Sequence, residues 1–404
     1  MTKKSTLVRK LSLPLLAFYG IGTILGAGIY VLVGKVAGVS GFYAPVSFIL
    51  ASLLAAFSAF SYAELAARFP RSAGEAVYVE EGFGIKSLSV VIGLMIVAVG
   101  IISTATLAHG FFGYLKVFVD LPETLVVIFL VLSIGFVCAW GIGQSVMIAS
   151  AMTIVEIIGL LIIIYVGRDA FHLIPTRLPD MIPPSDMSIW AGIFIGSFIA
   201  FYAYLGFEDI VNVAEEAIQP RINIPLAIII SLIVTTLFYI LISIVAIILI
   251  SPEKLSSSHA PLAMLYQTTT GQSPVVITII SLISVINGAL IQVIMASRVL
   301  YGMSRKQWLP EKIGVVNEKT HTPLNATIII ILLVLLFALS FPLLSLAKIT
   351  SFITLIIFMI INFALIKIKF SQKEYEGFKV PLFIPVTGGV STLMFVLYLS
   401  STFI

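Results

Sequence analysis

Residues 19–30 read YGIGTILGAGIY, and this stretch decides how the chain is interpreted. Four glycines fall within nine residues of an otherwise apolar segment. Glycine lowers helix propensity by about 1 kcal/mol relative to alanine, so a helix through this segment is predicted to break. The second half of the chain has a comparable interruption, AFYAYLGFED at residues 200–209.

The composition indicates that these two stretches lie inside a membrane. Of the 404 residues, 60% are hydrophobic and only 10% are charged, which does not suit a water-facing globular surface. Apolar runs of about 20 residues, the length a helix needs to cross the hydrocarbon core, recur from end to end. We place spans at 12–34, 42–67, 87–109, 123–140, 146–166, 190–212, 225–250, 274–301, 324–341, 349–367 and 381–404. The sequence thus predicts an all-α polytopic membrane protein with about eleven transmembrane helices and one membrane domain, residues 1–404.

The distribution of basic residues predicts the orientation. With the N-terminus inside, seventeen Lys and Arg lie on the cytoplasmic side of this arrangement and six lie outside. We therefore expect a multi-pass protein of the cell (inner) membrane with a cytoplasmic N-terminus and the C-terminus outside. The basic residues are spread over short loops, which argues against nucleic acid as a partner. The single cysteine, Cys138, excludes a disulfide framework.

A broken helix inside lipid frees backbone N–H and C=O groups, which is tolerable where they line a cavity or bind a ligand. The positive end of a half-helix suits a carboxylate, and exposed carbonyls suit an ammonium group or a cation. An α-amino acid carries both charges. The alternative is that the small residues only let neighbouring helices pack closely.

Four stretches match a known pattern in the expected order: GTILGAGIY at 22–30, RFPRSAGE at 68–75, YAYLGFED at 202–209 and SRVLYGM at 297–303. With them, the chain resembles the amino acid–polyamine–organocation superfamily of permeases. The resemblance implies a LeuT-type fold, a 5+5 inverted repeat with discontinuous helices 1 and 6. Repeat one would cover about 12–166 and repeat two about 190–367, with an extra C-terminal helix at about 381–404. It also implies alternating access around a central site.

The resemblance implies a set of substrate-binding positions: Ile24, Gly26, Ala27, Gly28, Tyr202, Ala203 and Leu205. The amides of residues 26–28 would hold the substrate carboxylate, and the carbonyls of Tyr202, Ala203 and Leu205 its ammonium group. Tyr202 matches an aromatic gate position, with packing as its alternative role. Glu208 is the other gate candidate, and a purely structural role is its alternative. The acids at 215–216 are expected to cap the helix end or to pair with Arg68 or Arg221.

Glu156 is the outstanding ionisable residue within the spans, where a charge costs about 2.5–3.5 kcal/mol. Proton-coupled members that this chain resembles carry a lysine at this position, which is a sodium site in sodium-coupled members. A buried carboxyl can carry a proton, or it can bind sodium together with Ser281 and Ser284. We favour the proton. A neutral, hydrogen-bonded glutamate without a coupling role is the third interpretation.

These features predict a secondary active transporter, a proton-coupled symporter of neutral or cationic amino acids that works by alternating access. The expected partners are an amino acid or amine substrate, a coupling proton or sodium ion, and the bilayer; no cofactor is expected. The alternatives are a polyamine or organic amine transporter, an amino acid exchanger, and a non-transporting amino acid sensor. An enzyme is not expected, because no metalloprotease or nucleophile–histidine motif occurs in the spans. A channel is disfavoured because the polar residues converge on one site.

Overall fold

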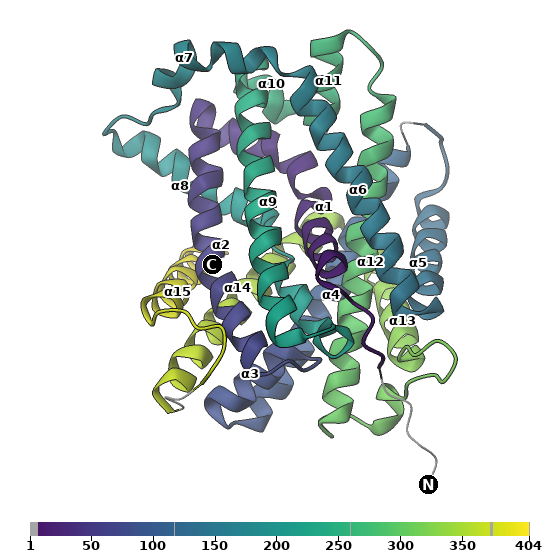
Figure 1. Cartoon of the computed structure of the whole chain (residues 1–404). Helices are drawn as coiled ribbons and strands as arrows, with labels where there is room; N and C mark the ends of the chain where they lie inside the picture. The colour runs from purple at the N-terminus through teal and green to yellow at the C-terminus, as the bar shows by residue number, and fades with distance from the viewer. Residues whose placement is uncertain (1–6, 117, 259, 372–374, 404) are drawn as a thin grey trace.

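The computed structural model describes residues 7–116, 118–258, 260–371 and 375–403, and these ranges are mainly helical (Figure 1). The long helices are α1 (Leu13–Ser40), α2 (Ala44–Arg68), α4 (Lys86–Leu115), α5 (Glu123–Trp140), α6 (Ile142–Val166), α8 (Met187–Ala203), α9 (Pro220–Leu249), α12 (Val275–Arg305), α13 (Leu324–Ser340), α14 (Leu343–Ser371) and α15 (Phe383–Phe403). Shorter elements are α3 (Gly74–Phe83), α7 (Asp169–Met181), α10 (Pro252–Ser257), α11 (Pro261–Thr270) and the 3-10 segments η1 (Gly41–Tyr43), η2 (Phe207–Glu216) and η3 (Glu311–Gly314).

Each predicted span overlaps one of the long helices. Within the described ranges, nine helical segments are long and apolar enough to cross a membrane, and the apolar parts of α13 and α15 are shorter. The outward side of α5 shows why lipid is the appropriate surroundings. Its exposed Leu125, Phe129, Leu132 and Phe136 follow one another at helical spacing, with Phe129 76% exposed. A stripe of this kind would be unfavourable in water.

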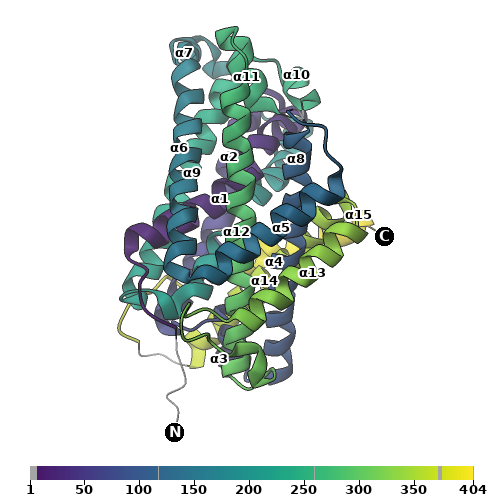
Figure 2. The same cartoon turned by 90° about the vertical axis from the view of Figure 1, so that its right-hand side faces the viewer.

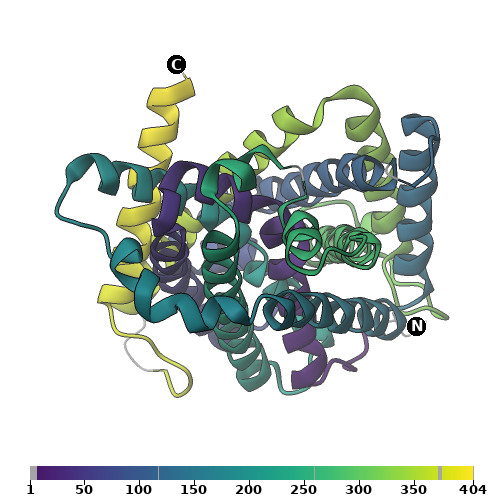
Figure 3. The ribbon, with the colours of Figure 1, turned by 90° about the horizontal axis from the view of Figure 1, so that it is seen from above.

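The two ends of the helix bundle differ. The N-terminal segment and α3 lie at one end, which we call the N-terminal face, whereas α7, α10 and α11 lie at the other, the opposite face (Figures 1 and 2). Seen from above, α7 runs across the opposite face instead of along the bundle (Figure 3).

Both predicted interruptions are present. α1 has a non-helical residue at Gly26, with φ 20° and ψ −147°. α8 ends at Ala203, and Gly206 follows with φ 127°, in the left-handed region that favours glycine. A Cβ atom on Gly206 would lie 2.6 Å from Cγ2 of Thr23, so the two interruptions lie against each other.

Several elements differ from the sequence-based expectation. The sixth span continues beyond its break as the 3-10 segment η2, where a regular helix was expected. The loop predicted at 68–84 contains α3, and residues 169–181 form α7, which was not predicted. The segment 252–272, expected to be an external loop with a short helix, forms α10 and α11.

Candidate functional site

A cavity of about 260 Å³ lies where the interruptions of α1 and α8 meet α4, α12 and α14. Of the predicted site residues, it is lined by Ile24, Gly26, Gly28, Tyr202, Ala203, Leu205 and Glu208. The backbone of Ala27 lies within α1, but its side chain is outside the described part of the structure. Residues predicted from two distant stretches of sequence therefore surround one space.

The cavity lies on the half of the bundle that is farther from the N-terminal face. Along α4, which starts next to α3 on that face, the lining residues run only from Val99 to Tyr114. The remaining lining side chains are mostly apolar or carry hydroxyl groups, among them Ser103, Thr106 and Thr354. The cavity could thus hold a small molecule with one polar end and one apolar end.

Two side chains from neighbouring helices donate hydrogen bonds to carbonyl groups that the breaks leave free. The hydroxyl of Tyr239 on α9 lies 2.6 Å from the carbonyl oxygen of Ile24 and 2.8 Å from that of Ala203. Ser284 on α12 donates to the carbonyl of Gly26 at 2.6 Å. One O–H group donates fully to one acceptor at a time, so the Tyr239 hydroxyl leaves capacity at Ile24 or Ala203 for another donor.

Glu156 lies behind the interruption of α1 and does not line the cavity. Its side chain is fully buried, and Oε1 accepts a hydrogen bond of 2.8 Å from Nδ2 of Asn287. The same Asn287 amide donates to Thr153, which in turn donates to the carbonyl of Phe18 in α1. Oε2 of Glu156 has no hydrogen-bond partner within the described part of the chain. This cluster connects α6, α12 and the first half of α1.

The other two predicted coupling residues differ in position. The Ser284 hydroxyl contacts the break directly, as stated above. The Ser281 hydroxyl donates to the carbonyl of Ile277 in its own helix at 2.9 Å. Among the residues that the structure describes, no group of three or more His, Cys, Asp or Glu is placed to hold a metal ion.

Successive contacts between η2, α12 and α3 lie between the cavity and the N-terminal face. We call these contacts, from Gln292–Asp209 through Gly74–Asn212 to Arg298–Glu216, the closure. Nearest the cavity, Gln292 donates to Oδ2 of Asp209 at 2.7 Å, and the amide of Gly206 donates to Oε2 of Glu208 at 2.7 Å. Beyond them, the amide of Gly74 donates to Asn212 at 3.0 Å. The bond from Gln292 connects η2 to α12 and the bond from Gly74 connects it to α3, and any opening toward this face must separate these elements.

A buried ion pair completes the closure. Nε of Arg298 lies 3.2 Å from Oε2 of Glu216, and both side chains are fully buried. The expectation that the acids at 215–216 pair with Arg68 or Arg221 is therefore wrong for Glu216. Arg68 is engaged by Glu64 in its own helix at 2.7 Å. A carboxylate that is buried this deeply needs a partner that is buried with it, and α12 brings Arg298 to that position.

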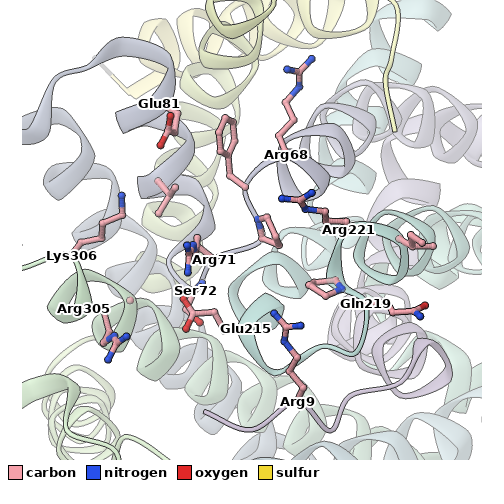
Figure 4. Close-up of a pocket in the computed structure, with 16 residues that line it drawn as sticks. Arg9, Arg68, Arg71, Ser72, Glu81, Glu215, Gln219, Arg221, Arg305 and Lys306 are labelled. Atoms are coloured by element: carbon pink, nitrogen blue, oxygen red, sulfur yellow. Dashed lines mark hydrogen bonds between the residues drawn. The ribbon is translucent and has the colours of Figure 1, made fainter. Parts of the chain in front are cut away.

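A second and larger cavity, of about 690 Å³, lies on the N-terminal face beyond the closure (Figure 4). Its lining contains more cations than carboxylates, with Arg9, Arg68, Arg71, Arg221, Arg305 and Lys306 against Glu81 and Glu215. The side chains reach it from several elements, as Figure 4 shows. This is the concentration of positive charge that is expected on a cytoplasmic side.

The sequence interpretation missed three important residues. Tyr239 is a polar residue inside the apolar run of α9, a signal that a search for isolated hydroxyls in spans would have found. Arg298 was counted only as a basic residue of the cytoplasmic side, although it lies inside a long predicted span. Glu75 was noted only as the last residue of the stretch RFPRSAGE. Asn287 and Gln292 were expected to bond across helices, and both do.

The fold defines a multi-pass membrane protein with a central cavity between two interrupted helices. The family model described as amino acid permease matches residues 11–404, and the chain belongs to this family of transporters. It is not an enzyme family, and the protein transports amino acids.

Curated relatives have the same kind of function. The chain is 27% identical to the branched-chain amino acid permease BcaP of Bacillus subtilis, over 98% of this chain and 88% of that protein. It is 30% identical to the mitochondrial cationic amino acid transporter 3 of Arabidopsis thaliana, over 90% of this chain, but it spans only 63% of that longer protein. It is 28% identical to the human cystine/glutamate transporter, over 98% of this chain and 80% of that protein.

Proposed function

We propose that the protein is a proton-coupled symporter that takes up a neutral or cationic amino acid by alternating access across the cell membrane. In this proposal the N-terminal face is cytoplasmic and the C-terminus is outside. The observation that carries the proposal is the cavity at which the breaks of α1 and α8 meet, closed toward the N-terminal face by hydrogen bonds and a buried ion pair. That arrangement is expected of a transporter whose site is reached from one side at a time.

The backbone of the substrate would be held by backbone groups of the two breaks. α1 resumes after Gly26, and the first amides of a helix have no acceptor within the helix. The amides of residues 26–28 would therefore bind the carboxylate, assisted by the positive end of the helix dipole. The ammonium group would bind the carbonyls of Tyr202, Ala203 and Leu205, including the acceptor capacity that Tyr239 leaves free.

The side chain of the substrate would lie against the apolar and hydroxyl groups of α4 and α12. No Lys or Arg is among the described lining residues, which disfavours a substrate with an acidic side chain. Glu208 is the carboxyl in the lining, and one of its oxygens is engaged by Gly206. A neutral side chain needs no further partner, whereas a cationic one would use Glu208. Tyr202 lines the same space and would act as the gate.

Glu156 would carry the coupling proton. Its carboxyl interacts with neutral groups, the Asn287 amide and the Ser284 hydroxyl, and no cation pairs with it within the described residues, so the neutral form is favoured at this depth. Loss of the proton would place a charge beside the first half of α1 and change how Asn287 and Thr153 hold that helix. Sodium, bound with Ser281 and Ser284, is the alternative coupling ion.

The two interrupted helices also support the 5+5 inverted repeat at about 12–166 and 190–367. α1 packs on α8, and α4 packs on α12, so equivalent helices of the two halves would be neighbours. The helix at about 381–404 would be the addition to this core.

Uptake by proteoliposomes tests the proposal. Labelled amino acids and polyamines would be offered with a proton gradient, with a sodium gradient, and with neither. We expect accumulation of a neutral or cationic amino acid under the proton gradient. Accumulation driven only by a sodium gradient would indicate that Glu156 helps to bind sodium. Uptake that requires unlabelled substrate inside the vesicles would indicate an exchanger. Movement of polyamines only would assign an organic amine substrate, and binding without movement would indicate a sensor.

A further inference from the structure

The closure between the cavity and the N-terminal face contains three carboxyl groups that lie near one another. Glu75 on α3 is 1% exposed and Asp209 on η2 is 2% exposed, while Glu208 lines the cavity. Each of the three is close enough to another to interact with it electrostatically. None of them belongs to the hydrogen-bonded cluster around Glu156.

No cation neutralises this group within the described part of the chain. Arg298 is paired with Glu216, and Arg68 is paired with Glu64. The hydrogen bonds to Asp209 and Glu208 come from neutral donors, the Gln292 amide and the Gly206 backbone. Three neighbouring carboxylates cannot all be charged in such surroundings, because burial and mutual repulsion both disfavour the ionised form. At least one of them must hold a proton.

Unpartnered polar atoms identify Glu75 as a place for that proton. Oε2 of Glu75 has no hydrogen-bond partner in the described structure, and the same is true of the hydroxyls of Tyr62 and Tyr78 and of Nδ2 of Asn212. All four of these side chains are buried, and the two tyrosine rings meet edge to face at 6.4 Å. Buried polar groups are normally hydrogen-bonded, so donors and acceptors that face one carboxyl indicate a site for a mobile proton and its hydrogen bonds.

The titratable groups that interact with this site come from α1, α2, α3 and η2. Tyr62 is contributed by α2, Tyr78 by α3 itself, and Glu208 and Asp209 by η2. Tyr19 on α1 faces Asp209 from the remaining side. None of these groups can supply a compensating positive charge.

We propose that Glu75, together with Asp209 and Glu208, forms a second proton-binding site, which must be protonated for the path to the N-terminal face to close. This inference rests on the proposed transport function and adds a site to it. The proton is bound while α3 and η2 are in contact through Gly74 and Asn212, and it leaves when they separate and water enters. Glu208 and Gln292 line the cavity, and Gln292 is hydrogen-bonded to Asp209. The proposed proton site is thereby connected with the cavity.

The direction of the pH effect follows from burial. Burial raises the pKa of Glu75 from 4.5 to about 8 in the closed state. In an open, hydrated state the pKa of Glu75 would return to its ordinary value of 4.5. Because the pKa is raised in the closed state, protonation favours closure fully only at pH values below the ordinary pKa of the open state, and this stabilisation is lost progressively as the pH rises to about 8. At neutral pH, opening therefore releases the proton toward the N-terminal face.

The test uses the full chain with Cys138→Ala and a reporter cysteine, Val213→Cys, at a buried position of η2. Labelling of the reporter from the N-terminal face and amino acid uptake would be measured from about pH 6 to about pH 9. With Glu75 present, we expect labelling to increase as the pH rises from about 6 and to level off above about 8, the raised pKa of Glu75. In Glu75→Gln the path should stay closed, with the labelling rate at the highest pH reduced by about tenfold or more, since one pKa unit corresponds to that factor.

Glu81→Gln, on the exposed side of the same helix, is the matched control and should behave as the parent. Glu75→Asp keeps a titratable group and should shift the pH profile without abolishing it, which covers the case that Glu75→Gln does not fold. An unchanged pH profile in Glu75→Gln would overturn the proposal. The proposal would also be overturned if labelling of the parent depended on sodium and not on pH, and if Glu75→Gln removed that dependence on sodium. If the parent moved no amino acid, the transport proposal would fail, while labelling would still report on this site.

Discussion

The Tyr239 hydroxyl on α9 lies 2.6 Å from the carbonyl oxygen of Ile24, at the point where α1 is interrupted. The same hydroxyl lies 2.8 Å from the carbonyl of Ala203, where α8 ends. One buried hydroxyl thus contacts a freed carbonyl of each broken helix and links the two breaks. Ile24 and Ala203 both line the central cavity, so this contact lies at its wall.

Tyr239→Phe should remove this connection without changing the packing of the ring. We expect the variant to lose about 1–2 kcal/mol of stability, because buried carbonyls lose their donor. The KM for uptake should rise by up to about tenfold, the factor that corresponds to 1.4 kcal/mol. Thermal unfolding and uptake kinetics measure the two effects. Tyr165→Phe, at an exposed position, is the control, and equal behaviour of the two variants would show that the contact is unimportant.

Gly206→Ala should disrupt the second break. Its φ of 127° is unfavourable for a residue with a side chain, and the added Cβ would lie 2.6 Å from Thr23. The left-handed conformation alone costs about 1–2 kcal/mol. We expect a lower melting temperature and strongly reduced uptake. Gly113→Ala, where the Cβ meets open space, should be neutral.

Gly28→Val tests the proposed carboxylate site. A Cβ at Gly28 would lie 3.1 Å from the Cα of Ala203, and a branched side chain would extend into the cavity that this glycine lines. Binding and uptake should fall by at least about tenfold while the protein still folds, corresponding to the loss of 1.4 kcal/mol or more of binding energy. Gly113→Val serves as the control for folding. Intact uptake in Gly28→Val would mean that the carboxylate binds elsewhere.

Glu156→Gln keeps the hydrogen bond from Asn287 possible but cannot exchange a proton. We expect uptake down a substrate gradient to persist and accumulation driven by a proton gradient to be lost. Measuring both modes in proteoliposomes separates coupling from binding. Transport with unchanged dependence on pH and sodium would contradict a coupling role for this residue.

Arg298→Met should leave Glu216 buried without its partner. Breaking a buried ion pair from one side costs about 3–5 kcal/mol. Replacing both residues, as in Arg298→Met with Glu216→Leu, removes the uncompensated charge and should recover much of the stability. The double variant should nevertheless close less well toward the N-terminal face, which reporter-cysteine labelling would detect. A double variant as unstable as the single one would show that packing, and not charge, is the main role of Arg298.

The sequence by itself determined the membrane setting, the approximate spans and the two interruptions. These features are local or compositional: apolar runs of span length, and glycines that weaken a helix wherever they occur. The positions around Gly26 and Ala203 could be predicted for the same reason, because the residues of each break are consecutive in the chain.

Only the tertiary structure decided which side chains meet. Glu216 lies against Arg298 instead of Arg68, Tyr239 reaches both breaks, and Glu75 faces Asp209 across the closure. Partners of this kind are separated by many residues, and they are selected by how α3, α9, α12 and η2 pack. Hydropathy along the chain contains no information about that packing. For the same reason, the sequence could not predict that the cavity is closed toward the N-terminal face.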